Sequence, residues 1–362
     1  MKIVEIIPKL DIGGAEVFVS SLSVELSKKH EVFLISFDKP SEEFIEKYNF
    51  NNVNLIFLNK RKGFDINLIF NLFIQLIRIN PDIIHTHLHC LDYALFSSIF
   101  LRKVKFYHTI HNLAHTQGNI YTRLFRLPFL FFKRIKLISI SKVIDESVKS
   151  IYYTNSNCII LNGSNDKSKE IVKDTSPFII DIFNRKHNIK KDTNIFINLA
   201  RITFQKNQRN LIEAFKNKPN SVCILIGPID ENYLKKEELK DISKNLIVVG
   251  PKIDVTKYFN IADFLILPSL YEGLPIAILE AMSTGIIPVC TGVGGVLEVI
   301  ENNTNGIIIK SPSIHDISSA ITYSEELTEK ERLNMSKKAI EDFNLKFSMV
   351  KCANNYLKLF NE

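Results

Sequence analysis

Short runs of β-branched and apolar residues alternate with helix-length segments along nearly all of this chain of 362 residues. The first run is followed by Gly13 and Gly14 and then by a segment with helical periodicity at 15–28, which predicts a strand, a glycine turn and a helix. Strands that alternate with helices form a parallel sheet covered on both faces. The predicted strands are 2–7, 32–37, 53–58, 83–87, 105–110 and 137–140, then 194–200, 222–227, 246–250, 264–267 and 286–290.

A polar stretch rich in Asn, Lys, Asp and Ser interrupts this alternation at 162–192, and the chain length suits about two domains. We therefore predict an α/β fold of two doubly wound Rossmann-like domains facing a central cleft, with ligands at the carboxyl ends of the strands. The N-terminal domain is placed at 1–165, a linker at 166–192 and the second domain at 193–345. A C-terminal helix at 346–362 is expected to pack back on the N-terminal domain.

Targeting and crosslinking signals are weak in this sequence. Glu5, Pro8 and Lys9 interrupt the apolar residues at the start of the chain before the core of a signal peptide develops. The most apolar segments, 68–77 and 124–132, are shorter than the roughly 20 residues of a membrane-spanning helix. The five cysteines lie far apart without a C-x-x-C pair, which disfavours a zinc cage or a disulfide framework. These features predict a cytoplasmic protein.

Positive charge is concentrated in the first part of the chain. Residues 1–150 hold 20 Lys and Arg against 14 Asp and Glu, a balance of +6, whereas the remainder holds 26 against 25. The excess suggests contact with nucleic acid or a phospholipid surface, or simply a basic surface. Within it, 119–136 combines Leu and Phe with five basic residues and no acidic residue. This composition is typical of a helix in the headgroup region of an anionic membrane at the inner face of the cell, and equally of a core-facing helix that Pro128 would kink or interrupt.

The most specific motif is LPSLYEGLPIAILEAMSTG at 267–285. Pro275 suits the first turn of a helix and Gly285 its C-terminal cap. The free backbone amides of the first turn carry partial positive charge, and Gly273 has no side chain to block an anion. The motif therefore predicts a seat for a phosphate or a sugar.

Two acids in this motif, Glu272 and Glu280, give it the E-x7-E pattern, and nearly the whole chain resembles the retaining GT-B glycosyltransferases of family 4. The resemblance implies that Glu272 lies beside the donor sugar, that Glu280 binds the nucleotide ribose, and that Gly273 and Leu274 offer backbone amides to the sugar and phosphates.

A second motif, LARITFQKN at 199–207, carries two cations after a predicted strand. On spacing alone a solvated basic loop explains it, but the family places an Arg and a Lys here against the donor diphosphate, which implies this role for Arg201 and Lys206. The chain contains no D-x-D sequence, which fits a site where these cations replace a metal and stabilise the leaving diphosphate. One departure is Ala200, where the family often has Gly.

Two glycine segments also resemble the family. Gly13 and Gly14 correspond to the loop that approaches the donor phosphates and the acceptor, and 292–298 corresponds to the segment after the E-x7-E helix. Neither completes the G-x-G-x-x-G fingerprint, which disfavours a dehydrogenase.

Histidines gather near the ends of two predicted strands. His85, His87 and His89 alternate, so within a strand they would share one face and could hold a metal. The family commonly has H-x-H here without a metal, and we predict none. The resemblance also implies a histidine that reaches the donor sugar, assigned to His111, with His108 as the less favoured choice.

Together these features predict a metal-independent, retaining glycosyltransferase that moves a hexosyl or N-acetylhexosaminyl group. The expected donor is a nucleoside diphosphate sugar, UDP-sugar first, and no separate cofactor is expected. The expected acceptor is a lipid-linked oligosaccharide, lipopolysaccharide, capsule or O-antigen precursor, and no nucleic acid partner is predicted. A nucleotide-sugar 2-epimerase of the same fold and a non-catalytic sugar-nucleotide-binding protein remain as alternatives.

Overall fold

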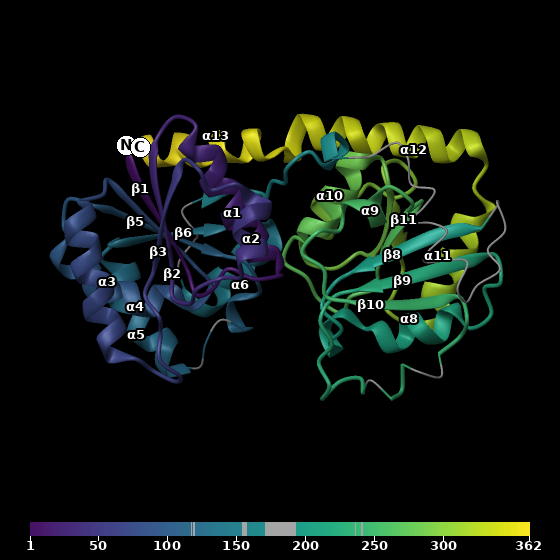
Figure 1. Cartoon of the computed structure of the whole chain (residues 1–362), viewed down its shortest axis with the longest axis horizontal. Coiled ribbons are helices and arrows are strands. Elements are labelled where there is room, and N and C mark those ends of the chain that lie inside the picture. The colour runs from purple at the N-terminus through teal and green to yellow at the C-terminus, as the bar shows by residue number, and fades with distance from the viewer. Residues whose placement is uncertain (117, 119, 154–157, 171–192, 236, 240–241) are drawn as a thin grey trace. The chain divides into compact units, whose positions relative to one another are not determined.

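The computed structural model describes residues 1–362 except 117, 119, 154–157, 171–192, 236 and 240–241. The chain divides into two compact units, Met1–Ser164 with Met349–Glu362, and Asn165–Ser348 (Figure 1). Most of the predicted linker, 171–192, lies outside the described residues. Its start does not act as a free connection, because Lys167–Glu170 forms the 3-10 turn η3 and belongs to the second unit.

The first unit is built on a parallel sheet of seven strands in the order β3-β2-β1-β4-β5-β6-β7. All six strands predicted for this part are confirmed, and β7 was not predicted because two residues are too few for a periodic pattern. The strands are β1 (Lys2–Ile7), β2 (Glu31–Ser36), β3 (Val53–Phe57), β4 (Ile83–His87), β5 (Lys105–Ile110), β6 (Ile135–Ser139) and β7 (Cys158–Ile159).

Helices of the first unit follow from local signals in the sequence. The Asp65 side chain accepts hydrogen bonds from two backbone amides and caps α3, which buries Leu68, Leu72 and Leu76 along one stripe and ends at Asn80 in the left-handed conformation. The helices are α1 (Gly14–Ser27), α2 (Glu42–Tyr48), α3 (Ile66–Ile79), η1 (Leu88–Cys90), α4 (Leu91–Phe100), η2 (Ala114–Thr116), α5 (Ile120–Phe131), α6 (Lys142–Tyr152) and α13 (Met349–Asn361).

The C-terminal helix α13 is tied to the sheet of the first unit by residues far apart in the sequence. The Tyr107 hydroxyl donates to the carbonyl of Leu359 at 3.0 Å, and the Lys105 ammonium donates to the carbonyl of Phe360 at 3.0 Å. Tyr356 is fully buried. The last helix of the chain therefore completes the core of its first unit.

Helix α5 differs from the expectation for 119–136 in two ways. Pro128 does not end the helix, which continues to Phe131. Arg126 is buried rather than solvated, and its guanidinium forms two hydrogen bonds with the Asp92 carboxylate at 2.7 and 2.8 Å. A partner on α4 converts this predicted surface cation into a core ion pair.

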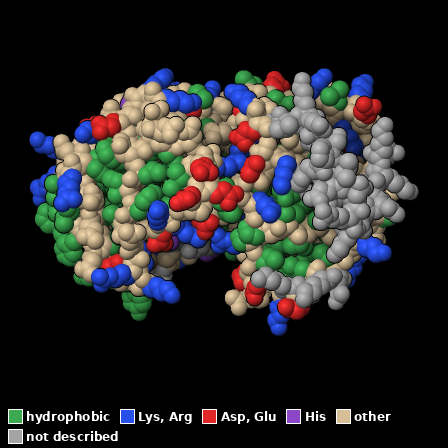
Figure 2. All heavy atoms as spheres, viewed as in Figure 1, with side chains coloured by type: hydrophobic (Ala, Val, Ile, Leu, Met, Phe, Trp, Pro, Cys, Tyr) green, Lys and Arg blue, Asp and Glu red, His purple; other side chains and the backbone are tan. Residues whose placement is uncertain are grey.

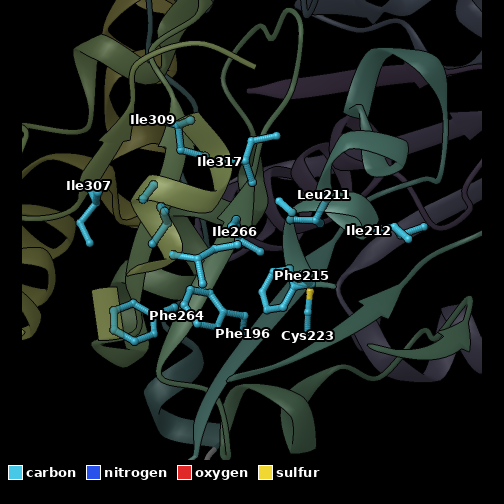
Figure 3. Close-up of a cluster of buried hydrophobic side chains, with 14 of the residues drawn as sticks. Phe196, Leu211, Ile212, Phe215, Cys223, Phe264, Ile266, Ile307, Ile309 and Ile317 are labelled. Atoms are coloured by element: carbon cyan, nitrogen blue, oxygen red, sulfur yellow. The ribbon is translucent and has the colours of Figure 1, made fainter. Parts of the chain in front are cut away.

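The second unit has a parallel sheet of six strands in the order β10-β9-β8-β11-β12-β13. Five were predicted, and β13 was missed because it has three residues. The core beneath this sheet is shown in Figure 3, where Phe196 stacks on Phe264 with ring centroids 4.8 Å apart and Phe215 meets Phe196 edge-on. The strands are β8 (Asn194–Leu199), β9 (Ser221–Ile226), β10 (Leu246–Gly250), β11 (Phe264–Leu267), β12 (Ile287–Thr291) and β13 (Ile307–Ile309).

Helices of the second unit begin and end at recognisable caps. Gly285 ends α10 in the left-handed conformation as predicted, whereas Pro275 lies at the N-cap, one residue before the helix begins. Thr328 and Glu331 form a capping box at the start of α12. The elements are η3 (Lys167–Glu170), η4 (Phe204–Lys206), α8 (Gln208–Phe215), α9 (Thr256–Phe259), α10 (Ile276–Thr284), η5 (Gly294–Glu298), α11 (Ile314–Glu326), α12 (Glu329–Asp342) and the π-helical turn η6 (Phe343–Phe347).

Each sheet has a point where the strand order reverses. In the first unit β1 lies between β2 and β4, and in the second β8 lies between β9 and β11. Open α/β sheets bind ligands outside the carboxyl ends of the strands at such a point. The loops that follow these strands therefore define the candidate site. None of the helices in the described part of the chain has both the length and the apolar character needed to cross a membrane.

Candidate active site

Two loops of the second unit, which follow β8 and β11, are joined by hydrogen bonds. The amide of Leu270 donates to the carbonyl of Gln205 at 2.8 Å, and the Gln205 side chain donates to the carbonyl of Tyr271 at 2.9 Å. The Asn207 side chain donates to the carbonyl of Pro268 at 3.2 Å. Although 60 residues of sequence separate them, the loops form one surface that carries both predicted motifs.

Lys206 and Glu272, one from each loop, form an ion pair. The Lys206 Nζ lies 2.5 Å from the Glu272 Oε1, and the two side chains are 19% and 6% exposed. Both charges are largely shielded from water, and this shielding strengthens the electrostatic attraction between them. The structure thus brings together a cation and an acid that were predicted from separate motifs.

Arg201 follows β8 on the same loop and is exposed. Its backbone is held by Gln208, whose fully buried side chain donates to the carbonyl of Arg201 at 3.0 Å. None of the described residues forms an ion pair with its guanidinium. Gly227 lies against Ala200, and a side chain at 227 would overlap the Ala200 carbonyl oxygen. Gly227, which follows the neighbouring strand β9, therefore lies in close backbone contact with the residue before Arg201.

The segment after β12 supports the loop that carries Glu272. The amide of Gly295 donates to the carbonyl of Gly273 at 2.7 Å. Gly294 has φ +57°, and a side chain there would overlap the Glu272 carbonyl oxygen. The glycines of this segment therefore act through backbone contact with the Glu272–Gly273 loop. Leu274 is buried just before α10.

Glu280 lies inside α10 and is buried next to an unpredicted cation. Burial acts to lower the pKa of Lys167, but the carboxylates of Glu280 and Glu170 outweigh it and raise that pKa. The Lys167 Nζ lies 2.9 Å from Glu170 Oε1, and the Lys167 amide donates to Ser283 of α10 at 3.1 Å. Sequence reasoning assigned Lys167 to a linker, because a lysine in a polar stretch carries no signal of burial.

In the first unit, Gly13 is the N-cap of α1 and Gly14 is its first residue. The carbonyl of Gly13 accepts the first helical hydrogen bond, from Val17 at 2.9 Å. A side chain at 13 would overlap the Glu16 carboxylate. This glycine pair thus lies at a helix N-terminus, after the strand at which the sheet order reverses.

Three histidines and an acid form a buried hydrogen-bonded group, which we call the histidine chain: Glu5, His85, His87 and His111. Glu5 Oε2 lies 2.9 Å from His85 Nδ1 and 2.7 Å from His87 Nε2, and His87 Nδ1 lies 3.0 Å from His111 Nε2. Glu5 and His85 meet because their strands pair in register. Sequence reasoning missed Glu5, although an acid inside an otherwise apolar strand signals a buried partner.

Burial and charge shift the pKa values in the histidine chain. Burial acts to raise the pKa of Glu5, but the two histidines outweigh it and lower that pKa to about 2. Burial, together with the nearby His85, lowers the pKa of His87 to about 4. Burial and the neighbouring histidines hold the pKa of His111 well below its usual value. At neutral pH Glu5 is charged, while His87 and His111 are neutral.

The predicted alternation of His85, His87 and His89 on one strand face is wrong for the third residue. Strand β4 ends at His87, Leu88 takes a positive φ of 54°, and His89 lies in η1. Within the described part of the chain, one group could bring three potential ligand atoms within 4.8 Å of one another, and it consists of Glu5, His85 and His87. The distances from Glu5 to His85 and His87 are hydrogen-bond distances, so in this structure the Glu5 carboxylate bonds directly to both histidines.

His108 does not join the histidine chain. Its Nδ1 lies 2.9 Å from Thr86 Oγ1. Thr86 lies between His85 and His87 on β4, and His108 of β5 is its partner in the sheet. Successive side chains of a strand point to opposite faces, so His108 and His87 lie on different faces of the sheet. Of the two histidines considered from the sequence, His111 is the one joined to His87.

Comparison with known proteins agrees with the architecture. Residues 12–155 match Glycosyltransferase Family 4, and residues 180–342 match Glycosyl transferases group 1. A solved structure, Anabaena Alr3699/HepE in complex with UDP-glucose, is 17% identical with a TM-score of 0.83, covering 100% of this chain and 99% of that one.

Two curated relatives align with part of this chain. The UDP-Gal:alpha-D-GlcNAc-diphosphoundecaprenol alpha-1,3-galactosyltransferase of Escherichia coli is 32% identical over 174 residues, which are 43% of each chain. The N,N'-diacetylbacillosaminyl-diphospho-undecaprenol alpha-1,3-N-acetylgalactosaminyltransferase of Campylobacter jejuni is 31% identical over 185 residues, 50% of this chain and 48% of that one. The aligned region spans less than half the length of either relative.

Two parallel Rossmann-like sheets, with the motif residues at their reversal points, give this chain the GT-B fold. The two family matches place the chain within it more closely. This chain belongs to the group 1 glycosyltransferases, with a Glycosyltransferase Family 4 N-terminal region.

Proposed function

We propose that this protein transfers a hexosyl or N-acetylhexosaminyl group from a UDP-sugar to a hydroxyl group of a lipid-linked glycan, with retention of the anomeric configuration. The observation that carries the proposal is the surface formed by Arg201, Lys206 and Glu272 before α10. It combines an exposed cation, a shielded ion pair and a helix N-terminus within one unit. That combination suits a diphosphate joined to a polar sugar.

The chemistry assigned to this surface is stabilisation of the leaving group. As the bond between the anomeric carbon and the β-phosphate oxygen breaks, negative charge grows on that oxygen. Arg201 and Lys206 receive this charge, and preorganised cations stabilise it more in the transition state than in the bound donor. In this mechanism no metal ion stabilises the leaving diphosphate.

Retention is assigned to front-side displacement. The Glu272 carboxylate is paired with Lys206, so we give it the role of holding the sugar rather than that of a nucleophile. The acceptor oxygen bonds to the anomeric carbon on the face that the phosphate leaves, and the departing phosphate oxygen takes the hydroxyl proton. Glu280 is assigned to the ribose and His111 to the donor sugar.

The lipid-linked acceptor is supported by the names of the two curated relatives, which act on diphosphoundecaprenol-linked sugars. A polyprenyl chain resides in a membrane, so an enzyme that uses it benefits from a membrane-binding surface. The first unit offers one on helices α3, α4 and α5. Exposed apolar side chains there are Phe70, Ile74, Ile77, Ile99, Phe100, Leu124, Phe125, Phe131 and Phe132.

Charge on this face complements an anionic membrane. Figure 2 shows hydrophobic and basic side chains side by side along the left edge of the view, where Figure 1 has α3. Exposed basic residues near the three helices are Arg61, Lys62, Arg78, Arg102, Lys103 and Lys133. Of the three acidic residues within 60–136, two have partners within the first unit: Asp65 caps α3, and Asp92 forms an ion pair with Arg126. We therefore propose that the face meets anionic phospholipid, with Phe131 and Phe132 entering the headgroup region.

The function is tested by donor binding followed by transfer. Purified protein is screened for thermal stabilisation by UDP-, GDP- and ADP-sugars, and we expect a UDP-sugar to give the largest shift. The preferred donor, radiolabelled, is then incubated with polyprenyl diphosphate sugars. Release of UDP that requires the acceptor supports a transferase, whereas conversion of the UDP-sugar to its C2 epimer without an acceptor identifies an epimerase. Binding without turnover on any acceptor identifies a sugar-nucleotide-binding protein.

Membrane contact is tested by cosedimentation with vesicles of phosphatidylcholine alone or with phosphatidylglycerol. We expect binding to the anionic vesicles and at least a several-fold loss in the Phe131→Ser/Phe132→Ser variant, because buried apolar area drives insertion. Leu345→Ser, an exposed apolar residue of the second unit, serves as the control. Equal binding by the two variants would show that this face does not contact the vesicle membrane.

A further inference from the structure

The histidine chain contains protons whose positions are determined by its geometry. Glu5 is fully buried and charged, so both of its oxygens can only accept hydrogen bonds. The His87 Nε2 lies 2.7 Å from Glu5 Oε2 and must therefore carry the hydrogen. Since His87 is neutral at pH 7, its second ring nitrogen has no hydrogen and presents a lone pair.

The same argument extends one ring further. His87 Nδ1 presents a lone pair, and His111 Nε2 lies 3.0 Å from it, so His111 donates from Nε2. A neutral imidazole carries one hydrogen. The remaining nitrogen of His111, Nδ1, is therefore a hydrogen-bond acceptor.

Packing holds these rings in place. His85 contacts Glu5 from one side, and its Nε2 lies 2.7 Å from Thr109 Oγ1, which in turn lies 3.1 Å from the Tyr356 hydroxyl of α13. Phe18 of α1 packs edge-on against the rings of His87 and His111. His85 and His87 have no exposed surface, whereas His111 is 7% exposed. His111 is the member of the chain that reaches the surface.

We propose that Glu5 and His87 are positioning residues that hold His111 as its Nε2–H tautomer, so that His111 Nδ1 accepts a hydrogen bond from a sugar hydroxyl group. This rests on the proposed function, in which His111 meets the donor sugar. It adds a chemical requirement, since the group facing His111 must be a hydrogen-bond donor. A carbonyl or carboxylate oxygen at that position would meet a lone pair and be repelled.

The first test needs no substrate, and it uses one variant only to assign signals. Protein labelled with ¹⁵N-histidine is recorded in long-range ¹H–¹⁵N spectra at pH 7, and the His111 signals are assigned by their loss in His111→Gln. We expect a protonated Nε2 and an unprotonated Nδ1 for both His87 and His111. A His111 ring with the hydrogen on Nδ1, or with both nitrogens protonated, would overturn the proposal whether or not the enzyme transfers sugar.

The second test compares two replacements of His87. The Asn oxygen branches at the same distance from the backbone as His87 Nδ1, so His87→Asn keeps an acceptor for His111, whereas His87→Leu has a similar shape without one. We expect His87→Asn to retain the Nε2–H signature and most of the activity. His87→Leu should lose the single-tautomer signature and about tenfold in kcat/KM, the size of one lost hydrogen bond.

A matched control separates positioning from stability. His108→Leu removes a buried histidine from the opposite face of the same sheet and leaves the histidine chain intact. It should lower the unfolding midpoint without changing the His111 signature. If Asn and Leu at 87 alter His111 equally, the positioning role is excluded. If the signature is as expected but no donor sugar binds, the proposed function fails while the tautomer assignment stands.

Discussion

The two units of this protein share a sheet topology but place different chemistry at the carboxyl ends of their strands. The second unit presents charge at its surface, with Arg201 exposed and Lys206 paired to Glu272. The first buries its charge at Glu5 and surrounds it with histidines. Exposed cations suit a ligand that brings its own charge, whereas a neutral ring suits a hydroxyl group. One topology thus supports two kinds of recognition, because specificity resides in the side chains of the loops.

The largest effect should come from removing charge in the second unit. We expect Lys206→Ala to lower kcat/KM by about 10²–10³, because a preorganised cation next to a leaving diphosphate is lost. Steady-state transfer from the preferred UDP-sugar measures it. Lys216→Ala, which removes an exposed lysine paired with Glu213 at 2.8 Å, is the control and should change the rate less than twofold. A loss below tenfold at Lys206 would contradict its assigned role.

The second-largest effect should come from Gly294, whose backbone lies against the loop that carries Glu272. Both Gly294 and Gly250 have positive φ, +57° and +76°, but only a side chain at 294 would overlap the Glu272 carbonyl, whereas nothing lies within 4 Å of one at 250. Each Ala variant should lose about 1–2 kcal/mol from the left-handed backbone. Gly294→Ala should lose about 1–3 kcal/mol more through overpacking, together with activity. Denaturant unfolding of both variants measures the difference, and equal losses would show that the loop yields freely.

The buried acid and histidines should make the first unit sensitive to acid. His87 has a pKa of about 4 in the folded chain and about 6.5 when unfolded, so the unfolded chain binds more protons between these values. Stability from this group is present above pH 6.5 and is lost as pH falls towards 4, by about 1.4 kcal/mol per pH unit. Glu5, with a pKa of about 2, extends the loss below pH 4.5.

Hydrogen exchange at pH 6.5 and 5, followed by peptide, measures this acid sensitivity separately in each unit. Exchange should accelerate in β1, β4 and β5, after correction for the intrinsic pH dependence of exchange. His87→Asn, which has no titrating ring at 87, should show a smaller pH effect. Equal acceleration in both units would mean that the histidine chain is not its source.

The smallest effect should follow metal removal. Because the second unit supplies its own cations and we propose no metal ion in the site, treatment with EDTA should leave the transfer rate within about twofold. Added Mg²⁺ should not restore activity to Lys206→Ala, since the proposed mechanism gives the stabilisation of the leaving diphosphate to side-chain cations. Loss of turnover on chelation would overturn the assignment of charge stabilisation to Arg201 and Lys206.

Much of the fold and of the second unit's site could be predicted because the signals are local. Each strand and helix has a period that a short segment displays, and Gly285 terminates its helix through a conformation that glycine adopts readily. The pairing of Lys206 with Glu272 is different. It depends on adjacent strands β8 and β11 bringing two loops together, and no spacing in the sequence records that adjacency.

The first unit shows more clearly where sequence reasoning ends. Arg126 was grouped with surface cations, yet Asp92 on α4 draws it into the core. His89 was grouped with the other histidines, yet the strand ends before it. In each case the missing information was a partner, or a strand end, that periodicity does not contain.

The sequence by itself determined the alternating α/β architecture, the two-part organisation and the family motif with its two acids, because these depend on residues close together along the chain. Only the tertiary structure decided that Glu5 joins His87, that His111 rather than His108 completes the histidine chain, and that Lys167 lies beside Glu280. Glu5 and His87 are 82 positions apart and His87 and His111 are 24 apart, and the Lys167 amide binds Ser283 of α10, 116 positions away. Sheet register and helix packing select them, and both are properties of the folded core rather than of any local segment.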